Sequence, residues 1–591
     1  MFTTPYNIMA LIMIIVLSYL ILIPLFEMVR NSFSLAKVDV KAMKGSHAGQ
    51  FTLYYWKRLF DSAISMNMFY KPLAHSLVIA AFTSLFGITI GSLIAWLMVR
   101  SDLPHKKFFG LVLLIPYMLP SWALALSWNV LFRNTRIGGV PGFLCYLGLD
   151  IPDWLAYGPV PIIAVLSIHY YAYSYLLVSA ALRSINSEVE EMGEVIGASK
   201  TQILRRITFP LVLPAILSAL ILTFSKAIGT YGVPSMLGLK VGYYTIPTMI
   251  HSTVTSSQSG MGYAISLTLI ALSAIFIFIN QRVIGKRKSY VTMSGKGTRS
   301  NPISLGKQKK LILALLYLFV ILVVFIPLVL MFYQTFMLKQ GNYSFSNLTL
   351  HYWIGKGRPD IYEGLDGVLR DTGFFRFLWN TVKLTLFTSI IASFIGQMIG
   401  YVNARGRKLR SGRFIEQLSF IPYLIPSIAF GAMYLSMFSK AKTIGPFTFI
   451  PSLYGSFALL VLVSVVKHLP FASRSGTSCM LQIGTDLEEA GQIAGAGFFT
   501  RFRRIVLPLA KNGFMNGFML IFISIMKELD LIVLLMSPKQ QTLSYLAFWY
   551  SAESWTQPSN CIAIVMFLLI FLTHWLSSKF FNADLTGGLG G

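Results

Sequence analysis

The sequence predicts an all-α polytopic membrane protein with 12 transmembrane helices, arranged as two tandem six-helix domains. The first observation is composition: 55% of the 591 residues are hydrophobic and only 12% are charged, whereas soluble proteins carry about 25% charged residues. The second is the recurrence of apolar runs of about 20 residues, the length that crosses a bilayer. The third is a charged segment in the first half of the chain that returns in the second half.

The repeated charged segment spans residues 188–210 in its first copy and 486–508 in its second. Each copy lies between two apolar runs. Six identical residues recur 298 positions later, and the pairs are Glu191 and Glu489, Gly197 and Gly495, Arg205 and Arg503, Arg206 and Arg504, Ile207 and Ile505, and Pro210 and Pro508. Six matches at one offset within a charged segment are not explained by membrane composition, so the chain contains an internal duplication.

Six apolar runs occur in each half and predict the transmembrane helices. In the first half, helices are expected near residues 8–30, 73–99, 109–132, 159–182, 211–236 and 261–282. In the second half, they are expected near residues 311–334, 378–403, 414–438, 456–480, 510–536 and 557–580. The pairs Pro116/Pro120 and Pro422/Pro426 are expected to kink the third and ninth helices, because proline removes a helical hydrogen bond.

The basic loops predict the orientation in the membrane, since Lys and Arg concentrate in short cytoplasmic loops. Such loops follow the second helix of each half and connect the two halves. With six helices per half, these loops, both charged segments and both termini lie on the cytoplasmic side. The external loop at residues 30–71 departs from the rule with seven Lys or Arg and two Asp, but long segments follow it poorly.

The duplication also predicts the domain organisation. The first domain is expected at residues 1–282 and the second at 311–591, joined by a linker at 283–310. The linker is basic and rich in Gly and Ser, which is typical of a flexible tether near the anionic cytoplasmic leaflet. Since both halves start on the same side, the repeat is parallel, and a transport pathway is expected between the halves.

The sequence shows no catalytic constellation. Its net charge of +27 is distributed over short loops, so a nucleic-acid partner is not expected. No G-x-x-x-x-G-K-[ST] motif is present to bind a nucleotide, and no His or Cys grouping has the spacing of a metal site. The scattered histidines, such as His169 and His468, are interpreted as packing residues. We therefore expect no enzyme activity, no catalytic residue, no metal site and no cofactor bound by this chain.

Each charged segment has the pattern of a docking element. Acidic residues at positions 188–194 suit the positive N-terminal end of a short helix. Gly197 permits a turn, and Pro210 suits the first turn of the following transmembrane helix. An ordinary charged loop would explain either copy alone, but the duplication favours a surface element that binds a partner.

This pattern, a Glu with Gly six residues later and Pro a further thirteen residues on, resembles the EAA loop of ABC importer permeases. The whole chain resembles two type I permease domains in tandem. In that family the loop forms a coupling helix that sits in a groove of the cytoplasmic ATPase. The second copy, with Glu489-Ala490, is the closer match, whereas the first has Met192-Gly193, which implies that the two ATPase contacts differ. The resemblance assigns ATPase coupling to Glu190, Glu191, Gly197, Ala198, Arg205, Arg206, Pro210, Glu488, Glu489, Ala490, Gly495, Arg503, Arg504 and Pro508.

The resemblance also implies partners and a location. A cytoplasmic ABC ATPase dimer would hold ATP and Mg²⁺, and an extracellular or periplasmic solute-binding protein would deliver the cargo. The chain would be a multi-pass protein of the plasma (inner) membrane, with the lipid bilayer around it.

Four ionisable residues, Lys226, Lys527, Glu528 and Asp530, are expected inside the helix that follows a charged segment. Such groups cost about 2.5–3.5 kcal/mol to insert, so they are candidates for the translocation pathway; packing pairs or snorkelling side chains are the alternative. The motif Lys527-Glu528-Leu529 is similar to the fifth-helix region of fused ferric-iron permeases, and this resemblance implies ferric iron as the cargo. Thiamine, phosphonate and polyamine permeases share parts of this pattern. A stand-alone secondary transporter with two six-helix repeats is the alternative from another class.

Overall fold

The structure, a computed structural model, describes residues 5–581 except 44, 186, 257, 286–301, 407–408 and 445. Within these residues, nine helices are long and apolar enough to cross a membrane, and three bent helix pairs raise the number to 12 if each pair is one span. The predicted fold class is therefore confirmed. Most of the linker predicted at 283–310 lies outside the described residues.

The helices follow the order predicted from the apolar runs. The first half contains α1 (Pro5–Ser32), α2 (Tyr54–Phe60), α3 (Lys71–Arg100), α4 (Lys106–Val112), α5 (Ile115–Met118), α6 (Ser121–Phe132), α7 (Thr135–Gly138), α8 (Phe143–Tyr146), α9 (Asp153–Ala156), α10 (Pro159–Ser184), α11 (Ser187–Val195), α12 (Lys200–Ile203), α13 (Phe209–Ile228), α14 (Gly232–Leu237), α15 (Ile246–Thr255) and α16 (Ser259–Gly285). The second half contains α17 (Lys309–Val320), α18 (Ile326–Gln334), α19 (His351–Ile354), α20 (Thr372–Arg405), α21 (Arg410–Leu424), α22 (Ser427–Phe438), α23 (Phe457–Gln482), α24 (Asp486–Ile493), α25 (Phe498–Arg501), α26 (Leu507–Leu509), α27 (Lys511–Met526), α28 (Leu543–Ala552) and α29 (Thr556–Phe581).

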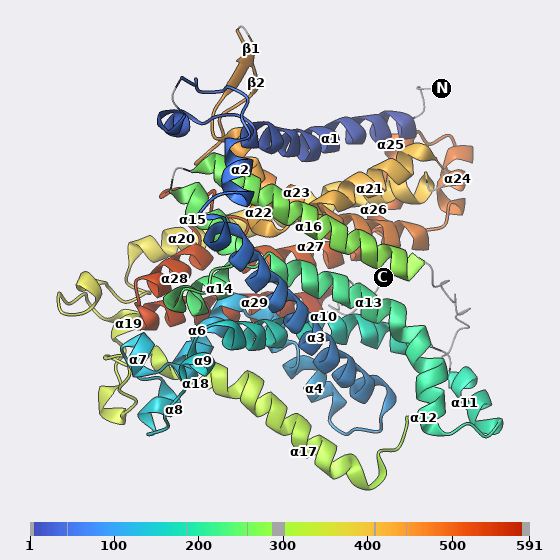
Figure 1. The fold of residues 1–591 in the computed structure, drawn as a ribbon. Coiled ribbons are helices and arrows are strands. Elements are labelled where there is room, and N and C mark those ends of the chain that lie inside the picture. The colour runs from blue at the N-terminus through green and yellow to red at the C-terminus, as the bar shows by residue number, and fades with distance from the viewer. Residues whose placement is uncertain are drawn as a thin grey trace.

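One small sheet accompanies the helices in the described part of the chain. Strands β1 (Lys442–Ile444) and β2 (Phe447–Ile450) pair antiparallel in the loop between α22 and α23. In Figure 1 this hairpin stands out from the helices at the top of the view, whereas α24 lies at the right. It is the one departure from the predicted all-α fold class, and it adds no strand to the helical core.

The third and ninth membrane segments are broken at proline, as the sequence predicts. The chain bends by 95° before α6 and by 106° before α22. In both cases the residue before the proline is extended: Leu119 has φ −69° and ψ 144°, and Ile425 has φ −90° and ψ 122°. A proline disfavours helical geometry in the residue that precedes it, so Pro120 and Pro426 end one helix and begin the next.

The fifth and eleventh helices are shorter than predicted. The apolar runs predicted spans to residues 236 and 536, but α13 ends at Ile228 and α27 ends at Met526. The expectation that Lys527, Glu528 and Asp530 lie inside a helix is therefore wrong. The Glu528 carboxylate accepts a hydrogen bond from the Leu531 N–H at 2.9 Å, and this local contact competes with helical hydrogen bonding.

Within each half, the second and fourth membrane segments pack closely, α3 against α10 and α20 against α23. Two glycines at matching positions of the duplication permit this contact. A Cβ at Gly91 would lie 2.3 Å from the Tyr171 carbonyl oxygen, and one at Gly396 would lie 2.4 Å from the Ala472 Cβ. Neither position has space for a larger residue.

The first helix of each half packs against the other half. Helix α1 contacts α21 and α22, and α18 contacts α6. The Tyr434 hydroxyl donates to the Leu20 carbonyl at 2.6 Å, and the Asn31 amide donates to the Ser436 carbonyl at 3.2 Å. The two halves are thus interlocked, and the space between them is enclosed by helices from both.

Candidate functional site

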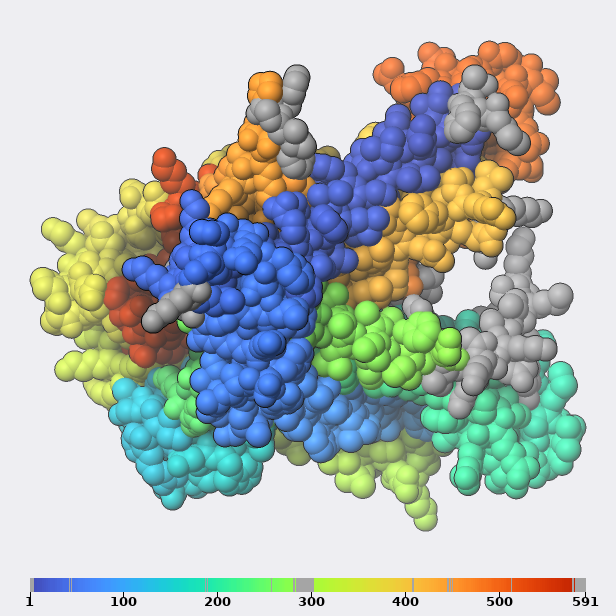
Figure 2. Space-filling view, turned by 45° about the horizontal axis from the view of Figure 1, so that its top comes forward, coloured from blue at the N-terminus to red at the C-terminus, as the bar shows by residue number. Residues whose placement is uncertain are grey.

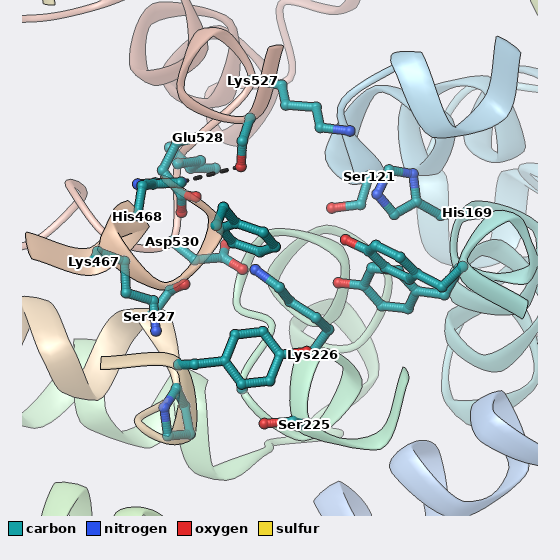
Figure 3. Close-up of a pocket in the computed structure, with 18 of the residues that line it drawn as sticks. Ser121, His169, Ser225, Lys226, Ser427, Lys467, His468, Lys527, Glu528 and Asp530 are labelled. Carbon is teal, nitrogen blue, oxygen red and sulfur yellow. Dashed lines mark hydrogen bonds between the residues drawn. The ribbon is translucent and has the colours of Figure 1, made fainter. Parts of the chain in front are cut away.

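The central cavity lies between the halves and is lined by residues of both. Its wall is formed by the breaks before α6 and α22, by α10 and α23, and by the ends of α13 and α27. Figure 3 shows side chains from both halves pointing into this space. The site therefore exists only because the two halves pack together.

Lys467 is an ionisable residue of the cavity that the sequence interpretation missed. It lies in α23 and is 7% exposed. Its ammonium group donates to the Pro422 carbonyl at 2.9 Å and also to the Ile425 carbonyl. These carbonyls lie at the end of α21, where the helix stops and its last acceptors lack helical partners. The signal was available, since a lysine inside the apolar run 456–480 is costly without a partner.

In the first half, His169 contacts a carbonyl at the equivalent helix break. The His169 Nδ1 lies 3.0 Å from the Pro116 carbonyl oxygen, and His169 precedes Lys467 by the 298 residues of the duplication. His468, which follows Lys467 in the sequence and also lines the cavity, contacts the Ser524 hydroxyl through Nε2 at 3.1 Å. The sequence interpretation treated both histidines as packing residues, but the structure places both in the cavity wall.

Two residues after α27 reach across to the first half. The Lys527 ammonium group donates to the Tyr117 carbonyl and lies 3.8 Å from the centroid of the Tyr117 ring. The Asp530 carboxylate accepts the Gly232 N–H at 3.0 Å and the Thr230 hydroxyl at 3.1 Å. Gly232 and Asp530 are themselves 298 residues apart, so equivalent positions of the duplication meet here.

Lys226, Lys527, Glu528 and Asp530, the four residues singled out in the sequence, all line this one cavity. In the described part of the chain, no ion pair joins the cavity lysines to the two carboxylates. Lys226 is half-buried. No hydrogen bond or ion pair holds its ammonium group within the described residues. It lines the same cavity as Lys467 and Lys527.

The charged segments form two short acidic helices, α11 and α24, which are located at the same end of the molecule (right in Figure 1). Figure 2 shows a hollow at the right of the view, between the orange part that carries α24 and the teal part that carries α11. Two residues after the end of each helix lies a glycine in the left-handed region, Gly197 with φ 89° and Gly495 with φ 81°, which agrees with the turn predicted at Gly197. Pro210 lies in the first turn of α13, also as predicted.

Each acidic helix contains a Glu-Glu pair, and the first glutamate of each pair, Glu190 or Glu488, is tied to its own half. Glu190 pairs with Arg100 at 3.2 Å and accepts the Thr208 hydroxyl at 2.6 Å. Glu488 pairs with Arg405 at 2.5 Å and accepts the Tyr401 hydroxyl at 2.9 Å. Arg100 and Arg405 are the last residues of α3 and α20. Both acidic helices are thus fixed to the second membrane helix of their half.

The second glutamates, Glu191 and Glu489, are exposed. Apolar side chains at the helix tips are exposed as well: Val195 is 88%, Ile196 85% and Ile493 89% accessible. Exposed apolar groups beside charges suit a surface that binds a protein partner. The other predicted coupling residues with exposed side chains are Arg205, Arg206, Pro210, Ala490, Arg503, Arg504 and Pro508, while Ala198 is half-buried.

The described end of the linker contacts the end of α3, beside the first acidic helix. The Ile303 N–H donates to the Arg100 carbonyl at 2.7 Å, and the Leu305 N–H donates to the Asp102 carboxylate at 3.0 Å. Lys309 pairs with the same carboxylate at 3.0 Å. The hydrogen bond from Leu305 and the charge of Lys309 lower the pKa of Asp102. This end of the linker is docked, whereas the sequence predicted a flexible tether.

Metal ligands do not gather in the described part of the chain: no group of three or more His, Cys, Asp or Glu side chains could hold a metal ion there. Both cavity carboxylates accept a hydrogen bond from a backbone N–H group.

The comparisons with known proteins agree with this architecture. The family described as "Binding-protein-dependent transport system inner membrane component" matches residues 87–289 and 392–581. The ferric transport system permease protein FbpB of Actinobacillus pleuropneumoniae is 24% identical over 79% of this chain, which spans 65% of that protein's length. The Fe(3+)-transport system permease protein FbpB 2 of Haemophilus influenzae is 22% identical over 87% of this chain and 92% of its own length.

A solved structure of the MetNI methionine ABC transporter aligns with 38% of this chain and 99% of its own, with 18% identity and a TM-score of 0.31, a likeness too low to carry an argument. The family match is independent of it and covers both halves. This chain belongs to the family of binding-protein-dependent transport system inner membrane components, with one family domain in each half.

Proposed function

We propose that this chain is the transmembrane permease subunit of an ATP-driven, binding-protein-dependent ABC importer. The observation that carries this proposal is the pair of acidic helices. Both are fixed by an arginine–glutamate pair, both expose a second glutamate and apolar side chains, and both lie at one end of the molecule. A matched pair of surfaces suits a matched pair of ATPase subunits.

In this proposal the ATPase dimer binds ATP and Mg²⁺ and contacts α11 and α24 on the cytoplasmic side of the plasma membrane. Both chain termini lie on that side, and the solute-binding protein docks at the opposite end. The domains follow the duplication, at residues 1–282 and 311–591 with the linker between them. This side assignment is supported by the basic residues near α24, such as Arg503 and Arg504.

The arginine–glutamate pairs give a route for coupling. When the ATPase dimer closes, it would move α11 and α24, and the pairs Arg100–Glu190 and Arg405–Glu488 would transmit that movement to α3 and α20. These helices pack against α10 and α23, which line the cavity. ATP binding shifts the transporter between two states only as far as it favours one of them.

The cargo we propose is ferric iron, with the central cavity as its pathway and Lys226, Lys527, Glu528 and Asp530 in its wall. Support for iron comes from the two FbpB relatives, which match most of this chain at 22–24% identity. The Lys527-Glu528-Leu529 sequence is in the part of the cavity that joins the halves.

The test is purification of the chain from its native membrane under mild conditions. An ABC ATPase should co-purify, and ATP hydrolysis in the preparation should rise when the matching solute-binding protein is added. The double variant Glu191→Arg/Glu489→Arg should lose the ATPase, while Glu363→Arg, in the loop before α20, should retain it. Purification without any ATPase would instead support a stand-alone secondary transporter.

A further inference from the structure

The central cavity contains more positive than negative formal charge. Three lysines line it, Lys226, Lys467 and Lys527, against two carboxylates, Glu528 and Asp530. Neither histidine in its wall adds a negative group. This balance of formal charge favours an anion over a bare cation.

The two carboxylates are already engaged. Asp530 uses one oxygen for the Gly232 N–H and the other for the Thr230 hydroxyl. Glu528 accepts the Leu531 N–H. These contacts hold the segment after α27 against the first half. Each carboxylate thus shares at least one oxygen with a backbone N–H, which offsets part of its negative charge.

The groups without partners are hydrogen-bond donors. Lys226 has no hydrogen bond or ion pair within the described residues, and Figure 3 shows its side chain extending into the cavity. Two further lining residues, Trp122 and Tyr423, have a buried indole N–H and a buried hydroxyl without a partner there. Buried donors of this kind need an acceptor, and an oxyanion supplies several.

The two broken helices add to this preference. Ser121 and Ser427 are the first residues of α6 and α22, each a 12-residue helix, and both line the cavity. The N-terminal end of a helix carries partial positive charge and exposes unpaired N–H groups. Two such ends, one from each half, therefore face the same space as the lysines.

We infer that the cavity accepts an anionic cargo, so that ferric iron crosses it as a complex with oxyanion ligands, such as carboxylates or phosphates, that carries net negative charge. This inference rests on the proposed import function and specifies its substrate class. A bare trivalent cation would add three charges to a cavity that is already positive, in surroundings where charge repulsion is strong. An anionic complex would offset this positive charge and would accept hydrogen bonds from the free donors.

The experiment measures binding to the purified full chain in lipid nanodiscs with three probes. Ferric dicitrate is an anionic iron complex, citrate is the anion alone, and hexaamminecobalt(III) is a trivalent cation that does not exchange its ligands. We expect ferric dicitrate to bind and hexaamminecobalt(III) not to bind. Lys226→Gln should weaken ferric dicitrate binding about tenfold, as expected for loss of one charge-assisted hydrogen bond.

Two variants serve as controls. Lys226→Arg keeps the charge and should keep most of the affinity, which separates loss of charge from misfolding. Lys440→Gln removes the same charge from an exposed position after α22 and should bind as the wild type does. Equal binding of ferric dicitrate by the wild type and Lys226→Gln would overturn the inference. So would tighter binding of hexaamminecobalt(III), or no binding of either anionic probe at millimolar concentration.

The iron proposal is judged separately by the same probes. If citrate binds as tightly as ferric dicitrate and both depend on Lys226, the anionic substrate class stands and iron loses its support. If ferric dicitrate binds and citrate does not compete, both proposals stand. Co-purification of the ATPase tests the import function itself and does not depend on either result.

Discussion

The two acidic helices are copies of one element, yet the chain holds them differently. Around α11, Arg100 is 2% exposed, and the described end of the linker pairs with the backbone beside it. Around α24, the side chain of Arg405 is 16% exposed, and Tyr401 supplies the additional hydrogen bond. Duplication preserved the arginine–glutamate pair while its surroundings diverged, so the pair is the common requirement and the linker contact belongs to the first half.

The same comparison applies inside the cavity. At the break in each proline-containing membrane segment, a backbone carbonyl contacts a side chain of the fourth membrane helix of that half. This side chain is His169 in the first half and Lys467 in the second. The positions are equivalent, but the second half places a lysine there, with two carbonyl contacts instead of one. The asymmetry between the halves therefore extends from the surface to the pathway, and it can be tested by changing matched residues.

The largest effect should come from the buried ion pair. Arg100→Met leaves Glu190 without its partner, and loss of one partner of a buried pair costs about 3–5 kcal/mol. We expect Arg405→Met to cost less, because that pair is more exposed. The measurement is the free energy of unfolding of the purified chain in mixed micelles. Arg358→Met, at an exposed pair with Asp360, should change it by about 0–1 kcal/mol. An effect of Arg100→Met no larger than that control would contradict the role given to this pair.

Next in size is the loss of coupling when the exposed glutamates change. Glu489→Arg should reduce ATP-driven uptake about tenfold, a coupling loss of about 1.4 kcal/mol. Gly495→Val should act in the same direction, because φ 81° is unfavourable for a β-branched residue. The first copy departs from the EAA pattern, so Glu191→Arg should have the smaller effect. Unchanged uptake in both charge variants would reject docking at these helices, and a larger effect at Glu191 would reverse the asymmetry.

A several-fold loss of uptake should follow from Lys527→Ala and from Glu528→Ala. Lys527 bridges to the Tyr117 carbonyl of the other half, and Glu528 fixes the segment after α27. Uptake is measured at equal amounts of protein in the membrane. Lys539→Ala, an exposed lysine in the same connecting segment, is the matched control. Normal uptake by the two cavity variants would leave both residues with a packing role only.

The smallest effect should appear at the linker. Asp102→Asn removes the pair with Lys309, so backbone amides near Ile303 should exchange hydrogen faster, while Asp360→Asn should leave them unchanged. Because its partners lower the pKa of Asp102 in the folded protein, this contribution is present at neutral pH and is lost as the pH falls below the ordinary range of aspartate. Equal exchange in the wild type and Asp102→Asn would show that the linker is held by its backbone bonds alone.

Much of the fold was accessible from local patterns. Hydropathy located the membrane segments, the fixed offset identified the duplication, and Pro120 and Pro426 marked the breaks in the third and ninth helices. The prediction failed where a helix ended inside an apolar run, after Ile228 and Met526. Apolar character reports that a segment is in the membrane, but it does not report where the backbone stops being helical.

The sequence by itself determined the fold class, the duplicated charged segments and the candidate residues of the pathway. Only the tertiary structure decided which glutamate of each pair faces inward, that Asp530 binds the Gly232 backbone of the other half, and that Lys467 belongs to the cavity. The reason is physical. Burial and helix formation depend on neighbours in the chain, whereas ion pairs and hydrogen bonds between residues hundreds of positions apart depend on how the two halves pack.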